Sequence, residues 1–547
     1  MPRRHAVAST AGIPGSSGTA SSPARLAAAV LRLREAVDAA APRARALGRQ
    51  VLAWSSTRIA PLDPVDLVER STAHDRTLWA RPDDRLCLAG VGSAWSFSAS
   101  GEDRFARAEA AWRSVVDQAV GAPQSAEQDS VHRNAERSPE PVPAVAGPVA
   151  FYGFAFTPGG TSRGPAAGDG GFAEWTAQPW AGYPDALILI PQVVVTRSAD
   201  EHWLILSAMA DGSGRFAAEA YEQALACLTP AEDGACVRSE APRGRAICAD
   251  TAEPNVPDRL SLIGEFPPAE TWKESVRVTA SAVAAGRLRK AVLARGIRVR
   301  ARRLDPAAAL RTLWADYPAC TLFAVAREGR WFLGATPERL VRVQNGEAEV
   351  AAVAGTARRG RTEDEDRRLG ELLLASAKDR LEHAIVVDAL REALAEVCTG
   401  VDAEDAPRLL TVRNAHHLYT PLRFALRDRQ TVLALTGRLH PTPAVGGAPV
   451  REALRWIHDR ERWDRGWYAG PIGWVRHTGE GEAAVGIRSA LVHDTEALLF
   501  AGCGIVANSD PDQEYAESDL KFRPVASALA ATVDPHHPVA APRRADT

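Results

Sequence analysis

Lysine is scarce in this chain of 547 residues. Of its 65 basic residues only four are lysine, and the rest are arginine. Lysine and arginine differ most where an amine must release its proton or act as a compact point charge. We therefore expect the four lysines to mark chemistry, against the alternative that they survived by chance; they are Lys273, Lys290, Lys378 and Lys521.

The sequence also lacks a charge excess and a long hydrophobic run. Its 65 basic and 68 acidic side chains leave a formal net charge of −3, which argues against a nucleic-acid partner because that function needs a basic surface. The longest apolar stretch, 186–195, is broken by Pro191 and Gln192. A membrane span needs roughly 20 apolar residues, so none is expected.

The seven cysteines form no recognisable pattern. Their number is odd and no CxxC occurs, which disfavours both a zinc site and a secreted disulfide framework. Arg3 and Arg4 lead into no apolar segment, so we expect a cytoplasmic protein. The acid-free start before Glu35 also resembles a transit peptide, although a low-complexity tail is the favoured interpretation. No GxGxxG or GxxxxGK[ST] motif indicates a nucleotide cofactor.

Composition divides the chain into four parts. Residues 1–24 and 531–547 are predicted to be disordered tails. Residues 25–262 form an N-terminal half with loop insertions near 121–147 and 229–258, and residues 263–530 form a denser catalytic region. The Gly-rich stretch 158–171 is also predicted to be a loop. Strands joined by tight turns such as Glu328-Gly329 and Asn345-Gly346 indicate a mixed α/β (α+β) fold with largely antiparallel sheets.

Hydrophobic periodicity predicts the individual elements. Helices are expected over 26–49, 270–285, 306–317, 365–398 and 450–457, and from about residue 512 onward. Strands are expected near 85–91, 149–156, 186–195, 202–208, 290–300, 321–327, 330–335, 340–344, 347–354, 484–492 and 497–501.

Lys290 and Glu338 are the first candidates for acid–base chemistry. Lys290 begins the strand KAVLAR, whose apolar residues would desolvate its amine and lower the pKa, as a general base requires. The alternative is a strand-end lysine that reaches solvent. Glu338 follows a strand in GATPERL. Taken alone, it is better explained as a turn carboxylate paired with Arg339.

Carboxylates on two predicted helices could hold a metal. Asp379, Glu382 and His383 share one helix face, which could be a metal site or, more simply, a salt-bridged surface. Glu517 and Lys521 stand four residues apart, the spacing of an ordinary helix ion pair.

Glycines and isolated polar groups in the C-terminal region could meet a ligand. In AGCGIV, Gly502 and Gly504 would let backbone N–H groups approach a carboxylate. His417, His440 and Arg488 lie within apolar stretches, where each needs a buried partner or a ligand.

Together, the motifs in this order and spacing resemble the chorismate-utilising enzyme family, and within it the isochorismate synthases. They are KAVLAR, GATPERL, AGTARRG, SAKDRLEH, LHPTPA, AGCGIV and the final ExxxK. The resemblance is strong over residues 265–527 and weak in the N-terminal half, where it includes FYGFAF and WAGYPDALILIP. It implies a chorismate-binding fold of two similar halves, with large, mainly antiparallel sheets inside and helices outside.

The resemblance also implies an isomerase that converts chorismate to isochorismate with Mg²⁺ as cofactor. Glu382 and Glu517 would hold the metal, Lys290 would deprotonate the attacking water, and Glu338 would protonate the departing ring hydroxyl. The residues implied in substrate binding are Thr356, His417, Thr442, Arg488, Gly502, Gly504 and Lys521.

Small differences within the family indicate the nucleophile. Members that use ammonia resemble one another in carrying glutamine where Lys290 stands, and aminodeoxychorismate synthases often carry lysine where Ala354 stands. Water is therefore the implied nucleophile, and no amidotransferase subunit is expected. A salicylate synthase, which goes on to expel pyruvate, is the alternative enzyme, and a non-catalytic subunit that docks an amidotransferase is a third hypothesis. The resemblance favours menaquinone over siderophore biosynthesis and leaves the oligomeric state open.

Overall fold

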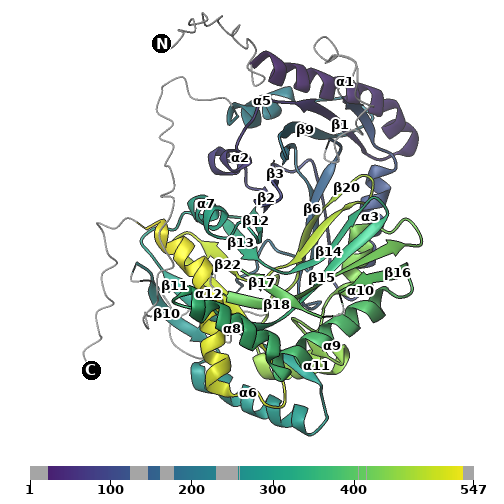
Figure 1. The fold of residues 1–547 in the computed structure, drawn as a ribbon. Helices are drawn as coiled ribbons and strands as arrows, with labels where there is room; N and C mark the ends of the chain where they lie inside the picture. Colours follow the sequence, from purple (N-terminus) through teal and green to yellow (C-terminus); the bar gives the residue numbers. More distant parts are fainter. Residues whose placement is uncertain are drawn as a thin grey trace, which may run out of the picture.

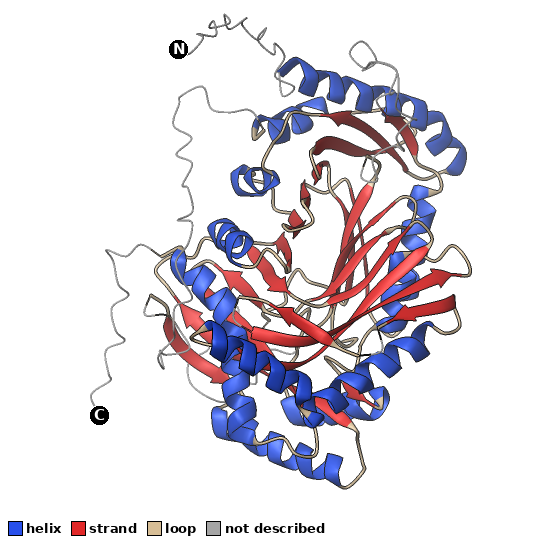
Figure 2. Ribbon diagram, in the orientation of Figure 1, coloured by secondary structure: helices blue, strands red, loops and turns tan. Residues whose placement is uncertain are grey.

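The computed structural model describes residues 23–123, 146–159, 178–228, 257, 259–404, 406–413 and 415–533. Most of the two predicted tails and of the three predicted loop insertions lies outside these residues. Figures 1 and 2 show helices at the periphery of the molecule and strands between them, as the mixed α/β prediction requires.

Two large sheets form the interior, and of all their strand pairs only β1 and β5 are parallel. In spatial order, the 13-stranded sheet contains β10 (Ser261–Phe266), β11 (Lys290–Arg300), β23 (Glu496–Ile505), β22 (Ser489–His493), β13 (Arg330–Thr336), β12 (Thr321–Arg327), β2 (Arg76–Arg81), β3 (Leu86–Val91), β8 (Val193–Ser198), β9 (Glu201–Ala210), β1 (Val51–Arg58) and β5 (Val120–Pro123), with β19 (Gly447–Ala448) beside β11. The 10-stranded sheet contains β16 (Cys398–Ala403), β18 (Ala415–Leu426), β15 (Glu347–Arg358), β14 (Arg339–Gln344), β21 (Gly481–Val485), β20 (Pro471–Arg476), β6 (Val149–Phe154), β7 (Ala186–Ile190) and β4 (Trp95–Ala99), with β17 (Arg408–Thr411) beside β18.

Helices cover the outer faces of these sheets (Figure 2). For example, α1 packs on β1 and β9, α9 on β15, and α12 on β23. The helices are α1 (Pro23–Leu47), α2 (Pro64–Arg70), α3 (Arg104–Val116), α5 (Ala218–Ala226), α6 (Ala269–Ala284), α7 (Pro306–Asp316), α8 (Glu363–Ala375), α9 (Ala377–Leu394), α10 (Val432–Leu439), α11 (Val450–Glu461) and α12 (Pro511–Ala531).

Both halves of the chain contribute strands to both sheets. In the larger sheet they meet where β12 pairs with β2, and in the smaller sheet they meet where β20 pairs with β6. Both junctions are antiparallel, so each half extends the sheets of the other. This arrangement agrees with the predicted fold of two halves.

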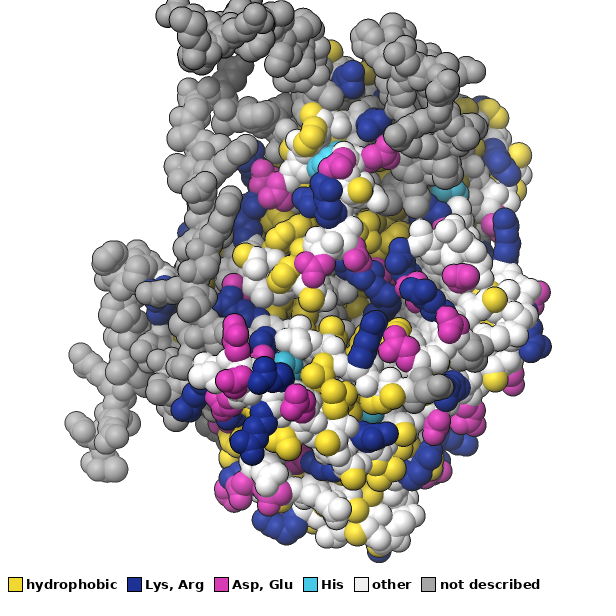
Figure 3. All heavy atoms as spheres, viewed as in Figure 1, with side chains coloured by type: hydrophobic (Ala, Val, Ile, Leu, Met, Phe, Trp, Pro, Cys, Tyr) yellow, Lys and Arg dark blue, Asp and Glu magenta, His cyan; other side chains and the backbone are white. Residues whose placement is uncertain are grey.

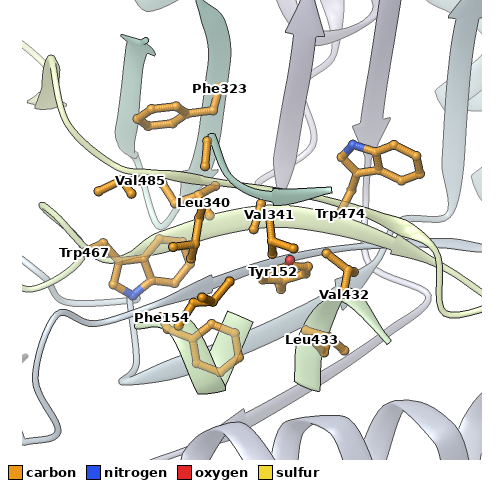
Figure 4. Close-up of a cluster of buried hydrophobic side chains, with 14 of the residues drawn as sticks. Tyr152, Phe154, Phe323, Leu340, Val341, Val432, Leu433, Trp467, Trp474 and Val485 are labelled. Atoms are coloured by element: carbon orange, nitrogen blue, oxygen red, sulfur yellow. The ribbon is translucent and has the colours of Figure 1, made fainter. Parts of the chain in front are cut away.

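The main hydrophobic core fills the space between the two sheets. Figure 4 shows part of it, where Phe323 of the larger sheet and Tyr152 and Val341 of the smaller sheet lie in one cluster. A second core lies on the outer face of the larger sheet, beneath α1, α7 and α12. Successive residues of β12 face different cores, Phe323 one and Leu322 and Ala324 the other, so strands buried on both faces appear in the sequence as continuous apolar runs.

Three predicted elements are wrong because each is split by a local feature. The helix expected over 365–398 is two helices, since Ser376 is extended and caps α9 with its side chain, and Cys398 starts a strand. The strand expected over 484–492 is divided between the two sheets at Arg488, whose φ is +51°. The strand expected over 186–195 is divided into β7 and β8 between Ile190 and Val193.

The tight turns are confirmed. Glu328-Gly329 and Asn345-Gly346 have positive φ at both residues, as two-residue hairpin turns require.

The surface is mixed in charge. Figure 3 shows Lys and Arg side chains interspersed with Asp and Glu side chains on the face that it displays. Within the described residues, no helix is both long and apolar enough to cross a bilayer. The five cysteines in this part of the chain are free thiols.

Candidate active site

One cavity, partly open to solvent, gathers most of the predicted site residues. It lies where β15 and β18 of the smaller sheet face β23 of the larger sheet, and where α9 and α12 pass beside them. Of the eleven predicted residues nine line it, namely Glu338, Thr356, Glu382, His417, Arg488, Gly502, Gly504, Glu517 and Lys521. The other two, Lys290 and Thr442, are buried but do not line it.

Lys290 is buried next to the cavity. It is the first residue of β11, as predicted, and it is fully shielded from solvent. Its Nζ lies 2.8 Å from Glu382 Oε1 on α9. A side chain at Gly504 would meet this pair, because a Cβ there would lie 2.5 Å from the Glu382 oxygen and 2.6 Å from Lys290 Cε. The glycine is therefore needed for the lysine to reach the carboxylate.

Glu338 faces the cavity from the connection between β13 and β14. It is 5% exposed, and its backbone carbonyl accepts a hydrogen bond from Val485. Burial raises the pKa of its carboxyl to about 7, although Lys290, Arg488 and Lys521 oppose the shift. A carboxyl with this pKa holds a proton near neutral pH and can donate it.

The alternative explanation of Glu338, an ion pair with Arg339, is wrong. The Arg339 guanidinium instead lies 2.7 Å from Glu482 and 3.1 Å from Glu349. Arg339 points into the smaller sheet while Glu338 points into the cavity.

A second group of charges lies on α12 and at the start of α9. Lys521 Nζ is 2.7 Å from Glu517 Oε1 and 2.7 Å from the Gly502 carbonyl oxygen. Lys378 Nζ is 3.0 Å from Glu514 Oε1. Burial favours a raised pKa for Glu517, but Lys521 and then Lys378 outweigh it and the pKa is lowered. Glu517 is therefore ionised near neutral pH.

His417 and Arg488 form the polar wall opposite these helices. His417 Nδ1 is 3.1 Å from Thr356 Oγ1, and its Nε2 is 3.5 Å from Arg488 Nη2. Burial, followed by the charges of Arg488 and Lys521, holds the pKa of His417 well below its usual range. The ring is therefore neutral, and because a guanidinium only donates, Nε2 accepts and Nδ1 carries the proton.

Thr442 and two further histidines lie outside the cavity wall. Thr442 Oγ1 is buried and has no hydrogen-bond partner in the described part of the chain. His383 Nε2 is 2.8 Å from Thr420 Oγ1, and His440 Nε2 is 2.9 Å from the Phe156 carbonyl oxygen. The two histidines therefore have internal partners, as buried polar groups need.

The carboxylates of the cavity fit a magnesium ion chemically. Among the described residues, one set of candidate ligand atoms lies within 4.8 Å of each other, from Cys503, Glu514 and Glu517. Glu382 lines the same cavity from α9. Carboxylate oxygens are the ligands that Mg²⁺ prefers.

Comparison with known proteins places this geometry in a family. The model of the chorismate binding enzyme family matches residues 36–530. The chain belongs to this family. The resemblance seen in the motifs is thus confirmed, and the protein is an enzyme.

Two relatives match nearly the whole chain. It is 35% identical to the "Salicylate biosynthesis isochorismate synthase" of Pseudomonas aeruginosa, over 91% of this chain and 94% of that protein. It is 30% identical to "Isochorismate synthase MenF" of Bacillus subtilis, over 91% of this chain and 97% of that protein. The solved structure of the menaquinone-specific isochorismate synthase MenF of Escherichia coli shares the fold, with a TM-score of 0.65 at 21% identity over 91% of this chain and all of that one.

Six charged or aromatic residues of this cavity were not predicted as site residues, one of them Phe500 on β23. Two of them, Lys378 and Asp379, stood in the motif SAKDRLEH, and the scarcity of lysine pointed to Lys378, whereas Glu514 lies on α12 three residues before Glu517. Arg465 and Tyr468 belong to the run RGWYAG. Its charged and aromatic residues carried no spacing signal, so only the fold reveals them.

Proposed function

We propose that this enzyme converts chorismate to isochorismate by adding water to the ring and expelling the ring hydroxyl. The observation that carries the proposal is the Glu338 carboxyl, whose pKa is raised to about 7 by burial in a cavity that also holds Arg488 and Lys521. A proton donor and cations then face one substrate, which suits a dianion that must lose a hydroxyl.

Lys290 is the proposed base in this reaction. Its Nζ lies 2.8 Å from Glu382, and its side chain shares a strand face with Val292, which lines the cavity. It would take a proton from the attacking water at Nζ. The side chains of Lys521 and Arg488 would hold the substrate carboxylates by charge-assisted hydrogen bonds.

Glu382 and Glu517 are the proposed ligands of Mg²⁺, with Glu514 close to the second of them. When bound, the cation would supply positive charge for a substrate carboxylate. Each glutamate already has a lysine partner, at 2.8 Å for Glu382 and 2.7 Å for Glu517. For Glu517 the charge of Lys521 lowers the carboxyl pKa, so this carboxylate is ionised near neutral pH and able to bind a cation.

Product analysis of the purified enzyme with chorismate tests the function. We expect isochorismate to accumulate with Mg²⁺ and not with EDTA, and no pyruvate to appear. Salicylate with equimolar pyruvate would instead establish the salicylate synthase alternative. Turnover that depends on ammonia or on a co-purified amidotransferase would exclude water as the nucleophile.

We also propose that the enzyme serves menaquinone biosynthesis and that it is located in the cytoplasm. The names of the two relatives divide between salicylate biosynthesis and MenF. A strain that lacks the gene should therefore be assayed for menaquinone, salicylate and catechol siderophores. We expect menaquinone to be lost, and cell fractionation to recover the enzyme with cytoplasmic markers.

A further inference from the structure

The strand that begins with Lys290 has a gap along one edge. One edge of β11 is covered by β23 over residues 291–300. The other edge pairs with β19 at Lys290 and Ala291, and with β10 only from Gly296 onward. Between these two short partners, no strand of the described part of the chain covers residues 292–295, of which Val292 lines the cavity.

A pair of side chains takes the place of the missing strand, together with the Gly446 carbonyl oxygen, which accepts from the Val292 N–H at 3.1 Å. Arg465 Nη2 donates to the Val292 carbonyl oxygen at 2.7 Å, and Glu461 Oε1 accepts from the Ala294 N–H at 2.7 Å. The same guanidinium also donates to the Val445 carbonyl oxygen at 3.0 Å. Arg465 and Glu461 are 3% and 7% exposed, so these backbone groups have little access to water.

The pair is itself rigid. Arg465 Nε lies 2.8 Å from Glu461 Oε2, and a second hydrogen bond joins Nη2 to Oε1 at 2.5 Å, so the contact is a bidentate fork. The guanidinium also lies 4.2 Å from the centre of the Phe156 ring. A fork of this kind fixes both distance and orientation. Lysine could not reproduce it, because its ammonium is a single point charge.

We infer that Arg465 and Glu461 are positioning residues, which set the place of the Lys290 amine by holding the backbone of β11 two and four residues further along. This inference rests on the proposed function, in which Lys290 is the base. Residues 290, 292 and 294 share one face of the strand, so a shift at Val292 moves Lys290 with it. A misplacement of about 1 Å can lower a rate about 100-fold.

Matched lysine substitutions test the inference, one at Arg465, which binds β11, and one at an arginine of β11 itself. Arg465→Lys retains the charge and loses the fork. Arg298→Lys makes the same change at a buried arginine of β11 itself, which is paired with Glu496 at 2.7 Å and is absent from the cavity. We expect kcat for chorismate to fall about 10-fold or more in Arg465→Lys with KM within about 3-fold of wild type. Arg298→Lys should lower the melting temperature and leave kcat unchanged.

Two results would overturn the inference. One is an Arg465→Lys enzyme with wild-type kcat and a melting temperature lowered as in the control, since the pair would then be structural only. The other is a raised KM at unchanged kcat, which would make Arg465 a substrate ligand. If Arg465→Lys does not fold, Glu461→Gln, nearly identical in shape, is judged by the same criteria. The rate of each variant is measured with the product that the wild-type enzyme makes from chorismate, whichever product that is. An error in the proposed function therefore does not decide the outcome of this test.

Discussion

At the scale of single residues, Glu338 links the stability of the fold to pH. Its folded pKa of about 7 lies above its ordinary value of 4.5, because burial disfavours the charged form. The neutral form therefore contributes stability below pH 4.5, and this contribution is lost as the pH rises to about 7. Glu338→Gln stays neutral throughout. We expect its stability relative to wild type to rise between these pH values by at most about 3 kcal/mol, measured by denaturant unfolding.

The same variant tests the acid role. Glutamine keeps the size of Glu338 but has no acidic proton, so turnover should fall about 100-fold or more while chorismate binding changes little. Steady-state kinetics and a binding titration measure the two effects. An active Glu338→Gln enzyme would show that the buried carboxyl is not the proton donor.

Lys290→Arg tests the base. Arginine keeps the positive charge beside Glu382 but does not lose its proton near neutral pH. We expect isochorismate formation to be lost. Lys273→Arg is the matched control, because Lys273 pairs with Asp512 at 2.7 Å outside the cavity and its ion pair accepts either cation. Comparable turnover in the two variants would remove Lys290 from the mechanism.

The scarcity of lysine predicted much of the site, whereas the partners of each lysine could not be predicted. Lys378 and Lys521 line the cavity, and Lys290 lies beside it. Lys378, however, pairs with Glu514, 136 positions away, and no local pattern encodes such a contact. Glu461 and Arg465 are only four residues apart, but the backbone groups that they bind on β11 lie 167 and 173 positions away, so these contacts are visible only once the strands are placed.

At the scale of elements, periodicity predicted β11 and β12 to the residue but missed the points where the chain changes direction. A helix break at Ser376 and a left-handed residue at Arg488 depend on single side chains and on contacts between sheets. Neither alters the hydrophobic pattern around it. Such breaks matter here, because Arg488 and the start of α9 both line the cavity.

The cap at Ser376 can be tested directly. Its Oγ accepts from the Asp379 N–H at 3.3 Å and also hydrogen-bonds the Asp379 carboxylate. Ser376→Ala should lower the free energy of unfolding by about 1 kcal/mol, whereas Ser376→Gly, which suits the cap position, should cost only a few tenths. Chemical denaturation of both variants measures the difference. Equal stability of Ser376→Ala and wild type would mean that the cap does not stabilise α9.

At the scale of the whole molecule, the cavity is assembled from parts that are distant in the chain. Its wall runs from Val292 on β11 to Lys521 on α12 and includes strands of both sheets. The rigid sheets therefore hold opposite charges close together before any ligand arrives. A ligand that binds between opposite walls of this cavity should stabilise the folded protein, because a ligand that binds only the folded state shifts the unfolding equilibrium.

Magnesium should therefore stabilise the whole fold, through Glu382 on α9 and Glu517 on α12. At a Mg²⁺ concentration of about 100 times Kd, the expected gain is about 2.7 kcal/mol, seen as a rise in melting temperature that EDTA reverses. Glu382→Ala and Glu517→Ala should each lose the rise. Glu274→Ala, which removes an exposed carboxylate of α6 paired with Arg277, should keep it. A full Mg²⁺-dependent rise in either site variant would contradict its assignment as a ligand, and this readout needs no turnover, so it separates metal binding from catalysis.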